Sequence, residues 1–217
     1  VLKKKFKEDE KKERVDGKRK ITVFITCELT VLAKELTEPK LQIETFPLNK
    51  PMKNFKTTTF FEGDDLFLYF RSPVSGYVTV YLDDNTYANR LLPYQTMPAA
   101  FENGMPVKAD KEYIFFSTAP EHNYFDDEFF EEDAYELYAE NQKDLNRIFV
   151  IFSKEPLDKP PLEENINKEI AEELAKENYT IPKATESEKF QRWLIKNHQI
   201  RRDLQVENII ISIEKIH

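Results

Sequence analysis

The most unusual chemistry-bearing stretch of this sequence is the acidic segment 121–136, EHNYFDDEFFEEDAYE. Calcium ions bind several carboxylate oxygens at once, and Asp126, Asp127 and Glu131 are the candidates to supply them. The segment lacks the alternating acidic residues and the glycine of an EF-hand loop, which favours a solvated acidic loop over a metal site. We therefore expect no bound cofactor, and Ca²⁺ remains the one alternative.

Aromatic side chains form a second group of candidate binding residues. Phe129 lies inside the acidic segment, where aromatic neighbours could form a contact surface for a basic partner. Tyr77, Tyr81 and Tyr94 lie on or beside predicted strands, and tyrosine rings on a sheet can stack against sugars or peptides. Such rings more often belong to the core of a sheet protein, so packing is the competing interpretation.

The usual signatures of a catalytic site are missing from the sequence. The chain has three histidines, none with the spacing of a zinc hydrolase, and no G-x-S-x-G motif marks a nucleophilic serine. Cys27 lies on the apolar face of a predicted strand, where it behaves as a small hydrophobic residue. The pairs Asp64–Asp65 and Asp83–Asp84 fall in predicted turns, where aspartate serves the backbone. We therefore expect no enzymatic activity.

The composition is that of a β-rich globular protein with a polar surface. Hydrophobic residues make up 40% and charged residues 33%, and the many Phe and Tyr side chains favour sheets. The net charge of −8 argues against nucleic acid as a partner, because phosphate binding requires a basic surface. No apolar run approaches the ~20 residues of a membrane-spanning helix.

Alternation of apolar and polar residues predicts a series of strands. The first begins at Ile21 and continues to Val31. Two aromatic runs, 66–70 and 77–82, are joined by the hexapeptide RSPVSG, and we predict that they form an antiparallel hairpin in the middle of one sheet. Further strands are predicted at 87–92, 112–117, 135–139, 147–153 and 206–213.

Helical patterns occur in three places. Residues 2–16 are predicted to be a charged helix end or a frayed segment, and residues 163–178 carry an apolar stripe at helical spacing. The best-signalled helix follows Thr185, which begins a capping-box sequence, TESE. Phe190 and Trp193 follow at helical spacing and are expected to pack that helix against the sheet.

These elements predict two parts of the chain. Residues 1–37 are interpreted as the C-terminal remnant of an upstream domain, consisting of a helix end and a strand. Residues 38–217 are predicted to be a mainly β domain, an antiparallel β-sandwich of Ig-like or jelly-roll-like type, with one or two peripheral helices.

The order of several motifs resembles the bacterial Domain of Unknown Function 4384 family. The resemblance covers about residues 55–217 and rests on FFEGDDLFLYFRSPVSGYVTVYL, NRLLPY, KEYIFFS, RIFVIFSKEPL and KFQRWL followed by RDLQVENIIISI. It implies a β-sandwich-like module of an exported or lipid-anchored envelope protein, with no assigned activity. It also implies that residues 1–32 are the tail of an upstream lipoprotein-like module.

We therefore expect a non-enzymatic interaction module of the bacterial cell envelope that binds a protein or a glycan. The expected location is the periplasm, the outer membrane or the cell surface, with an export signal ahead of Val1, and the expected state is a monomer or weak dimer. Two alternatives stay open: a hydrolase or carbohydrate-active accessory with an unrecognised site, and a calcium-stabilised structural module.

Overall fold

The computed structural model describes residues 4–15, 18–29, 40–95, 97–124, 134–162 and 182–215. The chain divides into two compact units, Val1–Thr37 and Glu38–His217.

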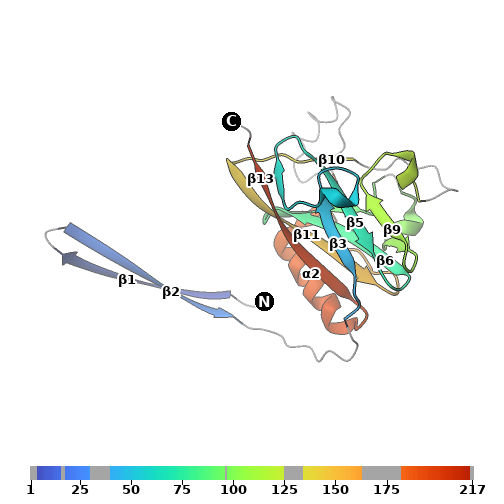
Figure 1. Cartoon of the computed structure of the whole chain (residues 1–217). Coiled ribbons are helices and arrows are strands. Elements are labelled where there is room, and N and C mark those ends of the chain that lie inside the picture. The colour runs from blue at the N-terminus through green and yellow to red at the C-terminus, as the bar shows by residue number, and fades with distance from the viewer. Residues whose placement is uncertain are drawn as a thin grey trace. The chain divides into compact units, whose positions relative to one another are not determined.

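The described part of the first unit is an antiparallel hairpin of β1 (Lys4–Val15) and β2 (Lys18–Leu29) (Figure 1). β2 confirms the strand predicted from Ile21, but the helix end predicted at 2–16 is wrong. Nearly every residue of β1 is charged, so its sequence shows neither helical nor strand periodicity. Pairing with β2 decides its conformation. The origin of this unit as the remnant of an upstream domain stays a prediction.

The described residues of the second unit form two sheets. The smaller contains β3 (Glu44–Leu48), β5 (Asp65–Arg71), β9 (Glu112–Phe115) and β10 (Tyr135–Glu136). The larger has the order β12 (Ala184–Glu186), β7 (Tyr87–Leu92), β6 (Gly76–Asp83), β11 (Lys143–Ser153), β13 (Gln205–Glu214) and β4 (Thr59–Phe61), with β8 (Met105–Val107) beside β6. All pairs are antiparallel except β13–β4.

The two sheets and one helix pack in layers (Figure 1). The main core lies between the sheets, where Phe70 of β5 packs near Phe152 of β11 with ring centroids 6.2 Å apart. The opposite face of the larger sheet packs against α2 (Ser187–Ile200), the single α-helix of the described residues. Phe190 of α2 contacts Tyr81 and Phe149 of that sheet. The fold is therefore a mainly β sandwich with one peripheral helix, as the sequence predicted.

The hairpin predicted for the two aromatic runs is wrong. β5 pairs with β3, β9 and β10 in the smaller sheet, whereas β6 pairs with β7, β8 and β11 in the larger one. Residues 72–75 therefore carry the chain from one sheet to the other instead of closing a hairpin turn. The serine hydroxyl of Ser72 donates to the carbonyl of Val74, 2.8 Å away, within this crossing.

The other predicted strands are found, with shifted ends. β7, β9, β11 and β13 confirm four of them, and the strand predicted at 135–139 is reduced to the two residues of β10. The helix predicted at 163–178 lies outside the described residues. Short 3-10 helices occur at Lys53–Phe55 (η1), Ala99–Phe101 (η2) and Pro120–His122 (η3).

The helix predicted after Thr185 is confirmed, but its capping box is wrong. The N-cap position of α2 is Glu186, and no side chain caps the helix. Thr185 belongs instead to β12, opposite Ala88 of β7, and its buried hydroxyl has no hydrogen-bond partner. Strand pairing fixes this residue before the helix begins, so its hydroxyl does not reach the first turn.

Thr185→Val is expected to raise the free energy of unfolding by about 1 kcal/mol, because valine keeps the β-branched shape and removes an unsatisfied buried hydroxyl. Urea unfolding of the two proteins measures the difference. A capping role for Thr185 would instead give a loss of about 1 kcal/mol, which would contradict the arrangement described above.

The strand β7 of the larger sheet contains a buried arginine that forms an ion pair. Arg90 is 2% exposed and donates to Glu102, 3.0 Å away, which also accepts from Lys159. Burial opposes ionisation of Glu102, but the hydrogen bonds from Arg90 and Lys159 outweigh it and lower the pKa of Glu102 to about 2. The ionised carboxylate is therefore much more stable in the folded chain than in the unfolded one.

This lowered pKa predicts a loss of stability in acid. The contribution of Glu102 is present above its unfolded pKa of about 4.5 and is lost as the pH falls toward about 2. We expect Glu102→Gln to cost about 2–3 kcal/mol near neutral pH and far less near pH 2. Urea unfolding of wild type and Glu102→Gln across this pH range measures the difference in unfolding free energy. Glu121→Gln, at an exposed position, is the control. A cost for Glu102→Gln that does not change with pH would contradict the prediction.

Candidate functional site

The face of the smaller sheet that points away from the main core carries ordered rows of side chains. Glu44 of β3, Arg71 of β5 and Glu112 of β9 are directly opposite one another in the strand register. The next row along the same face is apolar and contains Phe46, Tyr69 and Ile114. Directly opposed residues share a face of a sheet, so a charged row adjoins an apolar one. We call this surface the outer face.

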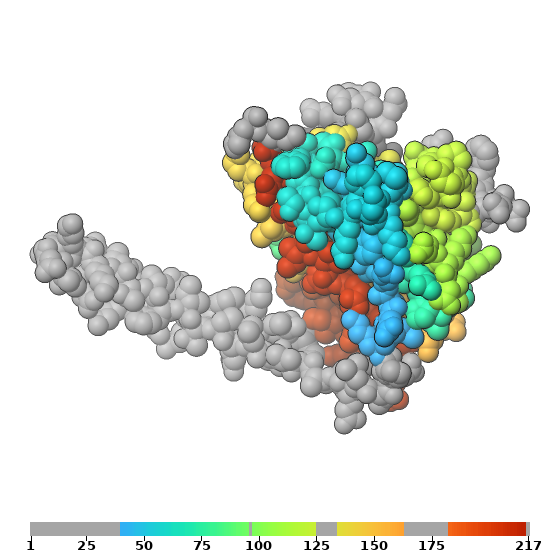
Figure 2. All heavy atoms as spheres, in the orientation of Figure 1, coloured from blue at the N-terminus to red at the C-terminus, as the bar shows by residue number. Residues whose placement is uncertain are grey.

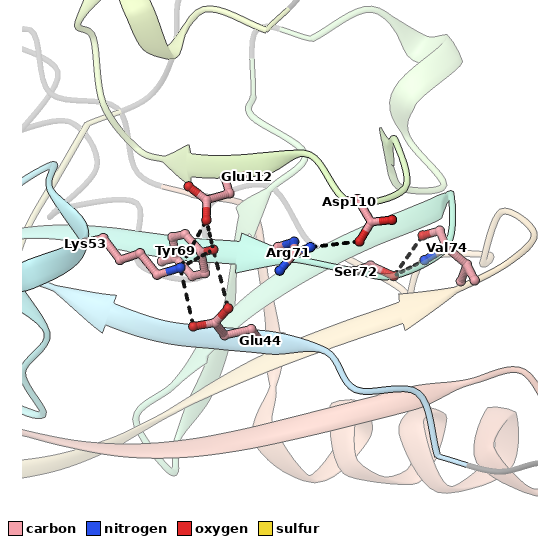
Figure 3. Close-up of polar contacts among 8 residues, drawn as sticks. All are labelled: Glu44, Lys53, Tyr69, Arg71, Ser72, Val74, Asp110 and Glu112. Carbon is pink, nitrogen blue, oxygen red and sulfur yellow. Dashed lines mark hydrogen bonds and ion pairs between the residues drawn. The ribbon is translucent and has the colours of Figure 1, made fainter.

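An ionic cluster of Glu44, Lys53, Tyr69 and Glu112 lies on the outer face (Figure 3). Lys53 of η1 donates to the Tyr69 hydroxyl at 2.8 Å and to Glu112 Oε1 at 3.0 Å. The Tyr69 hydroxyl in turn donates to Glu112 Oε1 at 2.7 Å. Glu44 is held more loosely, with 3.5 Å to Lys53 Nζ and 3.5 Å to the Tyr69 hydroxyl. The cluster joins η1, β3, β5 and β9.

The contacts in the ionic cluster shift the pKa values of Lys53, Tyr69 and Glu112. Hydrogen bonds from Tyr69 and Lys53 lower the pKa of Glu112. Bonds to Tyr69 and Glu112 raise the pKa of Lys53, and burial raises the pKa of Tyr69. An effective general acid or base requires a pKa near the working pH, and all three shifts move away from neutrality. This arrangement suits ligand positioning better than proton transfer.

A groove of about 400 Å³ begins beside the ionic cluster. Arg71 and Asp110 lie within it, and the Arg71 guanidinium donates to Asp110 Oδ1 at 2.9 Å (Figure 3). The groove is lined by Gln42, Ile43, Glu44, Arg71, Pro73 and Asp110. These residues come from the start of β3 and the two positions before it, from the end of β5 and the crossing segment after it, and from the turn before β9. In the space-filling view the segment leading into β3 (blue) and the segment around β9 (yellow-green) lie on the same visible face (Figure 2).

The turn that presents Asp110 is held in an uncommon conformation. Asp110 has φ +58°, in the left-handed region that aspartate tolerates better than most residues. Its backbone N–H donates to the carbonyl of Ser72 at 2.8 Å, and the N–H of Ala109 donates to the Ser75 hydroxyl at 3.0 Å. The segment that crosses between the sheets therefore also positions the carboxylate of the groove.

The predicted binding residues do not converge on this groove. Tyr81 is fully buried beneath α2, and Tyr94 is buried in the main core, where its hydroxyl accepts from the N–H of Phe116 at 3.0 Å. Tyr77 of β6 is half-buried. Phe129 and the candidate calcium ligands Asp126, Asp127 and Glu131 lie outside the described residues.

The groove residues were not predicted from the sequence. They lie in three separate segments that meet only through the pairing of β3 and β9 with β5. The sequence contains only an indirect indication of this site. Arg71 of the groove and Glu112 of the ionic cluster are charged residues at the ends of strongly aromatic strands. Charges at strand ends are common on solvated edges, so this signal does not identify a site.

Two further properties concern the described part of the chain. Within it, no three His, Cys, Asp or Glu side chains are grouped so that they could hold a metal ion. No helix there is long and apolar enough to cross a membrane.

Comparisons of the chain with protein-family models, with curated proteins and with solved structures find no match. Membership of the Domain of Unknown Function 4384 family therefore stays a prediction.

Proposed function

We propose that this chain is a non-enzymatic binding module of the bacterial cell envelope, and that it recognises a protein or a glycan through the groove on the outer face. The observation that carries the proposal is the groove itself, where Arg71 and Asp110 are fixed beside the ionic cluster. Concave surfaces with a few positioned polar groups are the common form of ligand sites.

The protonation states of the ionic cluster favour binding over catalysis. Lys53 and Glu112 are already paired with each other and with Tyr69, and the pKa shifts keep one charged positively and the other negatively. Groups of this kind provide fixed charges and hydrogen bonds to a ligand, whereas acid–base chemistry needs a group that changes protonation readily. These fixed charges favour a binding module over a hydrolase.

Binding of the whole chain to arrays of bacterial envelope glycans and to envelope protein extracts tests the proposal. We expect a ligand that wild type retains and whose affinity Arg71→Glu changes by about tenfold or more, because the reversed charge breaks the ion pair with Asp110 and alters the charge of the groove. The matched control is Arg192→Glu on the exposed surface of α2. Equal binding by both variants would exclude the groove, and chemical cleavage of the ligand would establish an enzyme instead.

The envelope location is part of the same proposal and is supported by the family resemblance alone. Fractionation of the bacterium that encodes the chain should recover it in the periplasmic, outer-membrane or surface fraction. Recovery with cytoplasmic markers would reject the location without affecting the binding site.

A further inference from the structure

We infer that the groove on the outer face receives a positively charged side chain, lysine or arginine, presented by a protein partner. The inference rests on the proposed function and specifies its ligand. The charges of the groove and the ionic cluster support it: three carboxylates, Glu44, Asp110 and Glu112, stand against two cations, Lys53 and Arg71. The site is therefore acidic overall, like the whole chain with its net charge of −8.

Glu44 and Asp110, the two carboxylates that line the groove, can accept further hydrogen bonds. Glu112 accepts two hydrogen bonds of 3.0 Å or less, whereas the contacts of Glu44 are both 3.5 Å long. Asp110 bonds to Arg71 through Oδ1, and its side chain is 64% exposed. The two cations, Lys53 and Arg71, already form short hydrogen bonds within the site, because each donates to a carboxylate at 3.0 Å or less. An incoming cation thus meets more favourable partners than an incoming anion.

The apolar part of the lining suits the stem of a long basic side chain. Ile43 is half-buried and Pro73 is exposed, and both line the groove together with Glu44 and Asp110. Lysine and arginine place their methylene groups on such surfaces while their charged ends reach polar partners. A sugar is less suited, because the nearby rings of Phe46 and Tyr69 are almost fully buried and offer no open stacking face.

Titration of the isotopically labelled whole chain with a blocked Gly-Arg-Gly tripeptide, followed by NMR, tests the inference. We expect shifts of backbone amides at residues 42–44, 71–72 and 109–112. The citrulline version of the peptide has nearly the same shape without the charge, and it should bind about fivefold more weakly, the size expected of one partly exposed ion pair. A Gly-Glu-Gly peptide and chitotriose complete the set of probes.

Variants of the groove give effects of opposite sign. Glu44→Gln and Asp110→Asn should each weaken binding of the arginine peptide by about three- to fivefold. Asparagine also adopts positive φ, so Asp110→Asn preserves the turn. Arg71→Gln should strengthen binding, because it removes the internal cation that competes for Asp110. Glu188→Gln on α2 is the control and should change nothing.

The outcomes separate this inference from the proposed function. Tighter binding of the glutamate peptide, weaker binding of the arginine peptide by Arg71→Gln, or groove shifts with chitotriose alone would overturn the inference and leave a binding groove. Groove shifts with none of the probes would overturn both. Groove shifts led by the arginine peptide, with the variant effects above, would support both.

Discussion

Gly76→Ala is expected to destabilise the β-sandwich by about 3 kcal/mol or more, because an added methyl group has no space. A Cβ at Gly76 would lie 2.4 Å from the backbone oxygen of Ser153 and 2.6 Å from the ring of Phe152. Both belong to β11, a central strand of the larger sheet, and the Phe152 ring is fully buried in the main core. Neither can move without disturbing the pairing of β11 with β6.

Urea unfolding of wild type and variant measures this loss, and Gly63→Ala is the matched control. Gly63 has φ +88°, and a Cβ there would have only Glu136 Oε1 nearby, at 3.7 Å. The control should therefore cost about 1 kcal/mol, from backbone strain alone. Equal losses for the two variants would show that β6 and β11 do not approach as closely as described.

Gly76 also illustrates that the strands could be predicted from the sequence, whereas their assignment to sheets could not. The alternation of apolar residues identified β5 and β6 as strands. Such a pattern shows that a segment is extended, but it does not show which strands pair with it. The assignment of the two strands to different sheets depends on contacts with β3, β9 and β11, which are distant in the sequence. The glycine that looked like part of a hairpin turn is required instead for close packing against Ser153.

The candidate site could not be predicted either, because it also depends on contacts between segments that are distant in the sequence. Arg71 and Asp110 are 39 positions apart, and their ion pair exists only because residues 72–75 and the turn before β9 are bonded together. The tyrosines that the sequence did single out were chosen for ring chemistry. Tyr81 and Tyr94 are packed inside the protein, where rings of this size contribute most to the core.

Asp83→Ala is expected to cost about 3 kcal/mol, because it leaves hydrogen-bond donors of two elements without their buried acceptor. Asp83 is fully buried, and its Oδ2 accepts from Arg147 Nη2 of β11 and from Gln191 Nε2 of α2, each at 3.0 Å. The sequence showed only a turn aspartate here. The partial exposure of Arg147 places the expected loss at the lower end of the range for broken buried ion pairs.

Urea unfolding gives the size of this effect, and fluorescence of Trp193, the chain's one tryptophan, reports whether α2 stays packed. The control is Asp84→Ala, where the lost bonds, to the N–H groups of Thr86 and Tyr87, lie at the surface and should cost about 1 kcal/mol. Replacing both members of the ion pair, as Asp83→Leu with Arg147→Met, should recover part of the loss, because the charge pair is then removed whole while Gln191 still lacks its acceptor. Equal losses for the two single alanine variants, with unchanged fluorescence, would mean that aromatic packing alone holds the helix.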